Sequence, residues 1–231
     1  ALNIHDHGYK ISVYNRSADK TDAFMSSNAK NTTIHASYEL SEFVQSIATP
    51  RKIILMVKAG EVVDNYINQL KPLLQPDDII IDGGNSLYTD TIRRVQSLAQ
   101  EQLIFMGVGI SGGEEGARHG PSIMPGGNIK GWPLVKDLLQ DISAKVNGQP
   151  CCDWIGEEGS GHYVKMVHNG IEYGDMQLIC EAYQFMREGL NLSVDEIADI
   201  FQQWNKGGLN SYLIEITSKI LRVKDDDGLP L

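Results

Sequence analysis

The sequence predicts an α/β fold that is built on a doubly wound, mostly parallel sheet and continues into a helical region. Two observations lead to this prediction. Up to about Gly156, short apolar runs alternate with amphipathic stretches, as in a parallel sheet with crossover helices. After Gly156 the strand signals stop and only helical periodicity remains. We therefore expect a Rossmann-like domain over residues 1–158, and the start of an all-α domain over residues 159–231.

The first domain is expected to alternate strands with helices. Its strand candidates are short runs of aliphatic and aromatic side chains, which favour extended backbone. These strands are predicted at residues 10–14, 53–57, 79–81 and 104–108. The connecting segments are amphipathic, as crossover helices are. These helices are predicted at residues 18–25, 38–47, 61–70 and 89–100.

The second domain is expected to contain helices only. Its first helix is predicted as one long, largely buried element over residues 160–187. A second helix is predicted over residues 193–204, where Ser193 and Glu196 have the spacing of a capping box. A third helix is predicted over residues 209–222, ahead of a charged turn.

Composition excludes several classes of protein. With 20 basic and 30 acidic residues, the net charge of −10 argues against nonspecific binding to nucleic acid or to a membrane. The three cysteines cannot form a disulfide framework, which indicates a reducing compartment and a cytoplasmic protein. No histidine or cysteine cluster has the spacing of a zinc site, so we expect no metal. There is no apolar run of the roughly 18 residues that a membrane span needs.

Residues 165–172 are the most informative segment for chemistry. Lys165 and Glu172 are seven residues apart, about two helical turns, so a helix would place an amine and a carboxylic acid on one face. His168 and Asn169 lie between them. A reaction with separate acid and base steps needs two such proton carriers. The alternative is a surface helix with an ordinary charge pair.

A second informative segment is rich in glycine. Residues 109–127 contain seven glycines in nineteen residues, so backbone N–H groups can approach an anionic ligand closely, and Ser111 adds a hydroxyl. A flexible surface loop is the alternative. Because Pro121, Met124 and Pro125 interrupt the segment and an apolar run precedes it, the sequence favours a shaped loop.

Together these segments resemble the decarboxylating 6-phosphogluconate dehydrogenases. The likeness covers the chain from Ala1 to about Asp227. The long, ungapped string at residues 161–177 is far more specific than a glycine motif alone. The matching strings are residues 15–17, 55–60, 82–86, 111–116 and 161–177.

The resemblance implies an NADP-dependent oxidoreductase of the pentose phosphate pathway and of gluconate utilization. Such an enzyme oxidises and decarboxylates 6-phospho-D-gluconate to D-ribulose 5-phosphate and CO2 while it reduces NADP to NADPH. The family also implies a cytoplasmic homodimer with a small-molecule substrate and no nucleic acid, membrane or metal partner.

The residue types after the second strand of the dinucleotide fold also favour NADP. NAD sites usually carry an acidic residue after the second strand, whereas Asn15, Arg16 and Ser17 offer a cation and two neutral polar groups, which suit a 2′-phosphate. A solvated loop charge is the alternative for Arg16. The resemblance adds four residues to the cofactor site: Val57, Lys58, Ala59 and Asn85.

Substrate contacts are implied by the resemblance. The expected substrate-binding residues are Asn85, Ser111, Gly112, Gly113, His168, Asn169 and Tyr173, with Tyr173 reaching the phosphate. Lys165 is the expected base for the C3 hydroxyl. Burial and neighbouring cations can lower the pKa of a lysine from about 10.4 towards neutrality. Glu172 is the expected acid for protonation of the enediol, and His162, one turn before Lys165, is expected at most to support it.

The ends of the chain suggest a fragment. The glycine-rich turn of a dinucleotide fold would lie just upstream of Ala1, and the family continues beyond Leu231 into a larger helical domain and a tail. We therefore expect the fragment alone to be inactive. The alternatives are a related NAD(P)-dependent β-hydroxyacid dehydrogenase, a noncatalytic binding module, and a structural or dimerisation remnant.

Overall fold

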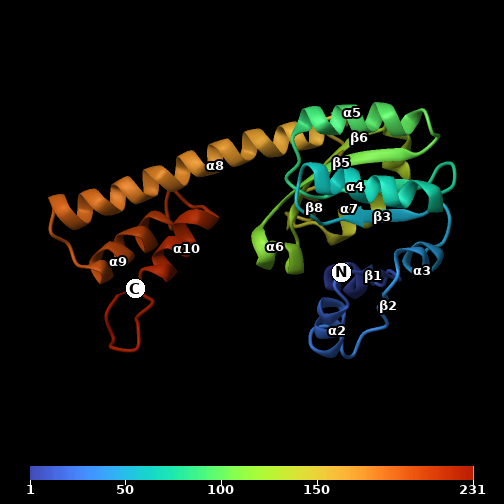
Figure 1. Ribbon diagram of the computed structural model, residues 1–231. Helices are drawn as coiled ribbons and strands as arrows, with labels where there is room; N and C mark the ends of the chain where they lie inside the picture. Colours follow the sequence, from blue (N-terminus) through green and yellow to red (C-terminus); the bar gives the residue numbers. More distant parts are fainter. Residues whose placement is uncertain (231) are drawn as a thin grey trace. The chain divides into compact units, whose positions relative to one another are not determined.

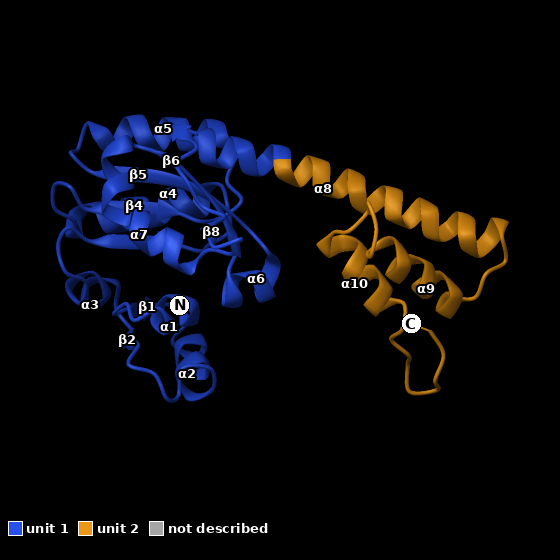
Figure 2. Ribbon diagram, turned by 180° about the vertical axis from the view of Figure 1, so that it is seen from behind, with its two compact units in different colours: residues 1–167 blue, residues 168–231 orange. Residues whose placement is uncertain are grey.

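The computed structural model describes residues 1–230 and divides into two compact units (Figure 2). Unit 1 comprises residues 1–167, and unit 2 comprises residues 168–231. The division falls inside helix α8 (Ser160–Gln184). The domain boundary that the sequence suggests, between residues 158 and 159, stays a prediction.

Unit 1 is organised around a five-stranded sheet of order β3-β4-β5-β6-β9 (Figure 1). Three of its four strand pairs are parallel, and β5 and β6 are antiparallel. The sheet is therefore mostly parallel, as predicted. Its strands are β3 (Lys52–Leu55), β4 (Ile79–Asp82), β5 (Ile104–Ser111), β6 (Ser122–Gly127) and β9 (Gly156–Glu157). Two smaller sheets pair β1 (Ser12–Tyr14) with β2 (His35–Ser37), and β7 (Lys145–Val146) with β8 (Gln149–Pro150).

Helices cover both faces of this sheet. Because successive strand residues point to opposite faces, Ile80 and Phe105 pack with α4 and α5, whereas Ile81 and Met106 pack with α7. Each such fully buried side chain contributes on the order of 1.5–3 kcal/mol. The helices of unit 1 are α1 (Leu2–Asp6), α2 (Ala18–Ser26), α3 (Leu40–Gln45), α4 (Glu61–Leu70), α5 (Tyr88–Ala99), α6 (Gly113–His119) and α7 (Trp132–Ile142), with 3-10 turns at Lys71–Leu73 and Ile129–Gly131.

The glycine-rich segment differs from its prediction as a shaped loop. It contains the end of β5, the short helix α6 and all of β6. The backbone ladder between β5 and β6 needs no side chain, and a Cβ at Gly126 would collide with the backbone of Gly161. Glycine inside a strand can mark such a close backbone approach.

Unit 2 contains the later part of α8 and the helices α9 (Val194–Trp204) and α10 (Tyr212–Ile220). A π-helical turn, Phe185–Gly189, ends α8. The capping box is confirmed: Ser193 Oγ accepts from the N–H of Glu196, whose carboxylate accepts from the N–H of Ser193. Apolar side chains of α9 and α10 form its core with the π-helical turn: Met186, Ile197, Phe201 and Ile214.

The prediction that the first helix is largely buried is wrong. In α8 only Gly161, His162 and Lys165 are buried, all within its first two turns. These turns pack against strands β5 and β6 of unit 1. Farther along, Ile171 and Leu178 are exposed to solvent in the described chain. An apolar side chain on a helix predicts burial but does not identify the element that covers it.

Candidate active site

The loop after β4 is held in one shape by the carboxylate of Asp82. This fully buried carboxylate accepts a hydrogen bond from the N–H of Gly84 at 3.0 Å and one from the hydroxyl of Ser86 at 2.6 Å. A Cβ at Gly83 would lie 2.7 Å from the sulfur of Met56, so glycine allows the loop to pack against the end of β3. The exposed side chain of Asn85 is thereby presented at the carboxyl edge of the sheet.

The segment after β3 and the end of β5 lie at the same edge. Val57, Lys58 and Ala59 follow β3, and Lys58 is exposed. Ser111 is the last residue of β5, and it is paired with Ser122 of β6. Gly112 and Gly113 follow, with φ angles of 138° and 59° that favour glycine. Because β3, β4 and β5 are parallel, the structure brings these predicted residues to the edge that carries Asn85.

The first turns of α8 rest on a surface made of glycine. A Cβ at Gly109 of β5 would lie 2.5 Å from the Cβ of Lys165, and one at Gly161 would collide with the carbonyl oxygens of Gly107 and Met124. Lys165 is only 7% exposed. The absence of side chains on β5 therefore lets the helix come close enough to place the base of the Lys165 side chain directly on the strand.

Helix α5 is anchored beside this surface by a buried arginine. Arg94 donates two hydrogen bonds to the carboxylate of Asp64, at 2.9 and 3.0 Å, and one to the carbonyl of Gly60 at 3.0 Å. Its Nη1 lies 3.5 Å from the carboxylate of Asp82. The hydrogen bond from Arg94, assisted by Arg93, lowers the pKa of Asp64 to about 2. This network fixes α5 relative to α4 and to the Asp82 loop.

The three residues predicted to select NADP follow β1, as expected. Asn15 accepts a hydrogen bond from the N–H of Ser17 at 3.0 Å, which orders the turn, and Arg16 is exposed between them. A cation and two small polar groups at the end of a parallel strand have the chemistry needed to bind a 2′-phosphate.

The remaining predicted residues lie on α8 within unit 2. His168 Nδ1 is 3.3 Å from the side-chain oxygen of Asn169 and 3.8 Å from the carboxylate of Glu172. The side chain of Glu172 is 38% exposed, and Tyr173 is 71% exposed. Here the helix itself brings together three of the predicted side chains, since positions 168 and 172 are one turn apart.

Three buried polar residues of unit 1 have no specific functional signal in the sequence. Asp82 follows the predicted strand at residues 79–81, and Thr91 and Arg94 lie in the predicted amphipathic helix at residues 89–100, so the local pattern assigns none of them a role. A charged residue on the apolar side of the predicted helix at residues 89–100 is the signal that would have found Arg94.

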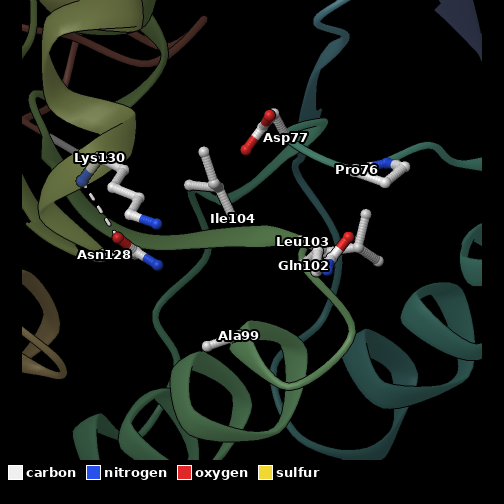
Figure 3. A pocket seen from close by; sticks show the side chains of 8 residues that line it. All are labelled: Pro76, Asp77, Ala99, Gln102, Leu103, Ile104, Asn128 and Lys130. Atoms are coloured by element: carbon white, nitrogen blue, oxygen red, sulfur yellow. Dashed lines mark hydrogen bonds between the residues drawn. The ribbon is translucent and has the colours of Figure 1, made fainter.

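A pocket of about 310 Å³ lies at the opposite edge of the sheet (Figure 3). It is lined by Pro76 and Asp77, which precede β4, by Gln102, which precedes β5, and by Asn128 and Lys130. These positions are at the amino ends of the parallel strands. Ligands of open α/β sheets bind beyond the carboxyl ends, so this pocket is separate from the candidate site.

Within residues 1–230, no three histidine, cysteine or acidic side chains are grouped so that they could hold a metal ion. The same residues include no helix with the length and apolar character needed to cross a membrane.

Comparisons with known proteins agree with this geometry. Residues 1–156 match the NAD binding domain of 6-phosphogluconate dehydrogenase, and residues 161–231 match the C-terminal domain of 6-phosphogluconate dehydrogenase. The chain is 59% identical to the decarboxylating 6-phosphogluconate dehydrogenase of Haemophilus ducreyi over 231 residues, which are 100% of this chain and 48% of that protein. It is 55% identical to the human protein of the same name, over 98% of this chain and 47% of the human one.

A solved structure is also similar. The 6-phosphogluconate dehydrogenase of Plasmodium falciparum, described in its apo form and in complex with NADP+ and with 6-phosphogluconate, superposes with a TM-score of 0.94 at 44% identity. The match covers 100% of this chain and 50% of that one. The chain thus spans about half the length of the relatives it matches.

Proposed function

The chain belongs to the 6-phosphogluconate dehydrogenase family, and we propose that it serves the oxidative decarboxylation of 6-phospho-D-gluconate to D-ribulose 5-phosphate with NADP as the oxidant. The observation that carries the proposal is the buried Lys165, seated on the glycines of β5. The loop that presents Asn85 lies at the same carboxyl edge.

Lys165 is the proposed base and Glu172 the proposed acid. The neutral amine of Lys165 accepts the proton of the C3 hydroxyl as hydride leaves C3. Bound NADP would supply the acceptor for that hydride at its nicotinamide ring. The product is a β-keto acid, so CO2 can leave while electrons flow into an enol, and the protonated Lys165 stabilises the developing oxyanion. Glu172 then donates a proton to the enediol at C1 of the product.

The other predicted residues bind and orient in this proposal. Lys58, Asn85 and the turn around Arg16 are proposed to bind NADP; the exposed cations and the order of the turn support this role. Val57 and Ala59, beside Lys58, are proposed to line the same site. Asn85 is also proposed to contact the substrate. The carboxylate and hydroxyls of the substrate are proposed to contact Ser111, Gly112, Gly113, His168 and Asn169. The phosphate of the substrate is proposed to contact Tyr173.

The function is tested in a full-length chimera in which residues 1–231 replace the matching segment of the Haemophilus ducreyi relative. We expect release of labelled CO2 from [1-¹⁴C]6-phosphogluconate in a 1:1 ratio with NADPH. NADPH formation without CO2 would instead indicate a nondecarboxylating hydroxyacid dehydrogenase. No turnover of a folded chimera would contradict the proposed activity.

Cofactor choice is tested at Arg16 in the same chimera. Changing Arg16 to Glu should raise the KM for NADP and spare that for NAD, since the 2′-phosphate loses its cation. Lys30→Glu, an equal charge change at an exposed position elsewhere, is the matched control and should leave both KM values unchanged. Equal use of NAD and NADP by the unmutated chimera would contradict the assignment.

A cytoplasmic homodimer is also part of the proposal. The thiols of Cys151, Cys152 and Cys180 are all free, which suits a reducing compartment. Exposed apolar side chains in unit 2, including Ile171 and Leu178, support a covering partner, and a second copy is the proposed one. Sedimentation of the chimera should give twice the monomer mass.

A further inference from the structure

His162 is a buried histidine that the proposed mechanism does not use. It lies one turn before Lys165 in α8 and is 1% exposed. Its Nδ1 is 2.7 Å from the hydroxyl of Thr91 in α5. Its Nε2 is buried and has no hydrogen bond of good geometry to any residue that the structure describes, although the backbone of Asp82 and Gly84 lies close enough to interact with the ring. A buried imidazole nitrogen without a well-formed hydrogen bond is unusual in a folded protein and calls for an explanation.

The ring lies beside three other elements of unit 1 near Lys165. The backbone of Asp82 and Gly84 lies beside it, in the loop that presents Asn85. A Cβ at Gly107 of β5 would lie 2.8 Å from Nδ1 of His162, and the absence of a side chain at Gly107 therefore makes room for the ring. One side chain therefore joins α5, β5, the loop after β4 and the turn of α8 that carries Lys165.

The charge state of the ring suits this position. Burial lowers the pKa of His162, and Arg94 lowers it further; the carboxylate of Asp82 and the backbone of Asp82 and Gly84 raise it, but the net shift is downward. The ring is therefore neutral at pH 7. A neutral imidazole can bond to the Thr91 hydroxyl without adding a second cation beside the amine of Lys165.

We propose that His162 is a positioning residue that, held by Thr91, fixes the first turn of α8 against the Asp82 loop and so sets Lys165 and Asn85 relative to each other. The inference rests on the proposed function for its consequence in catalysis. The coupling between the Asp82 loop and the first turn of α8 is a property of unit 1 and is expected whatever reaction the protein catalyses.

The test uses Thr91, where a matched pair of variants is available. Thr91→Val removes the hydroxyl and keeps the shape, whereas Thr91→Ser keeps the hydroxyl. In the chimera, we expect Thr91→Val to lower kcat by about 10- to 100-fold with little change in KM, because a displaced base loses alignment in the transition state. Thr91→Ser should retain kcat within about twofold. His162→Gln should behave as Thr91→Val does.

Equal kcat values for Thr91→Val and Thr91→Ser would overturn the proposal. So would a rise in KM at constant kcat, which would assign the network to binding. A drop in thermal stability with no change in kcat would reduce His162 to a structural residue and would also overturn it.

Hydrogen exchange separates this proposal from the proposed function. In the 231-residue chain, Thr91→Val should speed amide exchange several-fold in both residues 82–86 and residues 160–167, and Thr91→Ser should not. This coupling is expected even if the chimera fails to turn over 6-phosphogluconate, an outcome that would contradict the function alone. If Thr91→Val leaves amide exchange unchanged in residues 82–86 or in residues 160–167, the positioning role is overturned, even if the chimera is active.

Discussion

Helix α8 carries both proposed proton carriers, and the surroundings of the two differ. Lys165 is 7% exposed and rests on Gly109, within a surface that unit 1 builds from backbone. The side chain of Glu172 is 38% exposed, and His168 of the same helix is 3.8 Å away. The base is thus placed by tertiary packing, whereas within the described chain the acid is placed by the helix alone.

The glycines of the helix show the same difference. A Cβ at Gly161 would collide with two carbonyl oxygens of the sheet, while one at Gly170 or Gly174 would meet nothing within 4 Å. Glycine is needed at the first position for a close approach, but no neighbour in the described chain requires it at the other two. Within one helix, therefore, one glycine is required by tertiary packing and two others are not.

The largest effect is expected from Lys165→Met in the chimera. Because the same amine takes the C3 proton and then stabilises the enol oxygen, both hydride transfer and decarboxylation should fall by about 10⁴-fold. Stopped-flow absorbance at 340 nm and release of labelled CO2 measure the two steps. Hydride transfer at the unmutated rate would show that the buried amine is not the base.

A loss of about 10²- to 10⁴-fold in overall turnover is expected from Glu172→Gln, which keeps the shape and removes the acid. Hydride transfer should survive better than protonation of the enediol. Tritium exchange at C1 of ribulose 5-phosphate in labelled water reports the enediol step alone. Exchange at the unmutated rate would exclude Glu172 as the acid.

Substitution of glycine by alanine tests the packing directly. Gly161→Ala should lower the free energy of unfolding of the chain by about 3 kcal/mol, since backbone atoms of the sheet cannot move aside cheaply. Gly170→Ala is the matched control in the same helix, and it should stabilise the chain by about 0.5–1 kcal/mol. Urea unfolding measures both. Similar effects at the two positions would contradict the close approach at Gly161.

The smallest effect is a dependence of stability on pH. The pKa of His162 is lower in the folded state than its ordinary value of 6.5, so the unfolded state binds more protons as the pH falls below 6.5. The contribution of the neutral ring to the free energy of unfolding is therefore fully present above pH 6.5 and is lost as the pH falls. The slope should be at most about 1.4 kcal/mol per pH unit. Measurements above pH 5 avoid the titration of Asp64, whose stabilising contribution is lost only between about 3.8 and 2.

Two variants separate the two histidines of α8 in this experiment. His162→Gln should remove the slope, because the buried titrating group is gone. His168→Gln, at a half-buried position, should keep it. A slope that persists in His162→Gln would assign the pH dependence to another group.

Local sequence determined those parts of the molecule that depend on near neighbours in the chain. Alternating apolar runs predicted the strands β3, β4 and β5 and the helices between them. The capping box at Ser193 was readable from two residues three apart, and the spacing of Lys165 and Glu172 follows from helical periodicity. Arg16 was identified because it follows a strand. In each case the residues involved are only a few positions apart in the chain, so local backbone geometry is enough to predict the feature.

Tertiary structure decided the rest. Thr91 and His162 are 71 positions apart, and Arg94 reaches Asp64 across 30. The glycine-rich sequence predicted a loop that an anionic ligand could approach closely; the packed sheet shows instead that Gly109 and Gly126 are approached by the first turns of α8 and that β6 pairs antiparallel with β5. Such contacts depend on which faces of distant elements meet, and that is fixed by the packing of the whole core rather than by the pattern of any one segment.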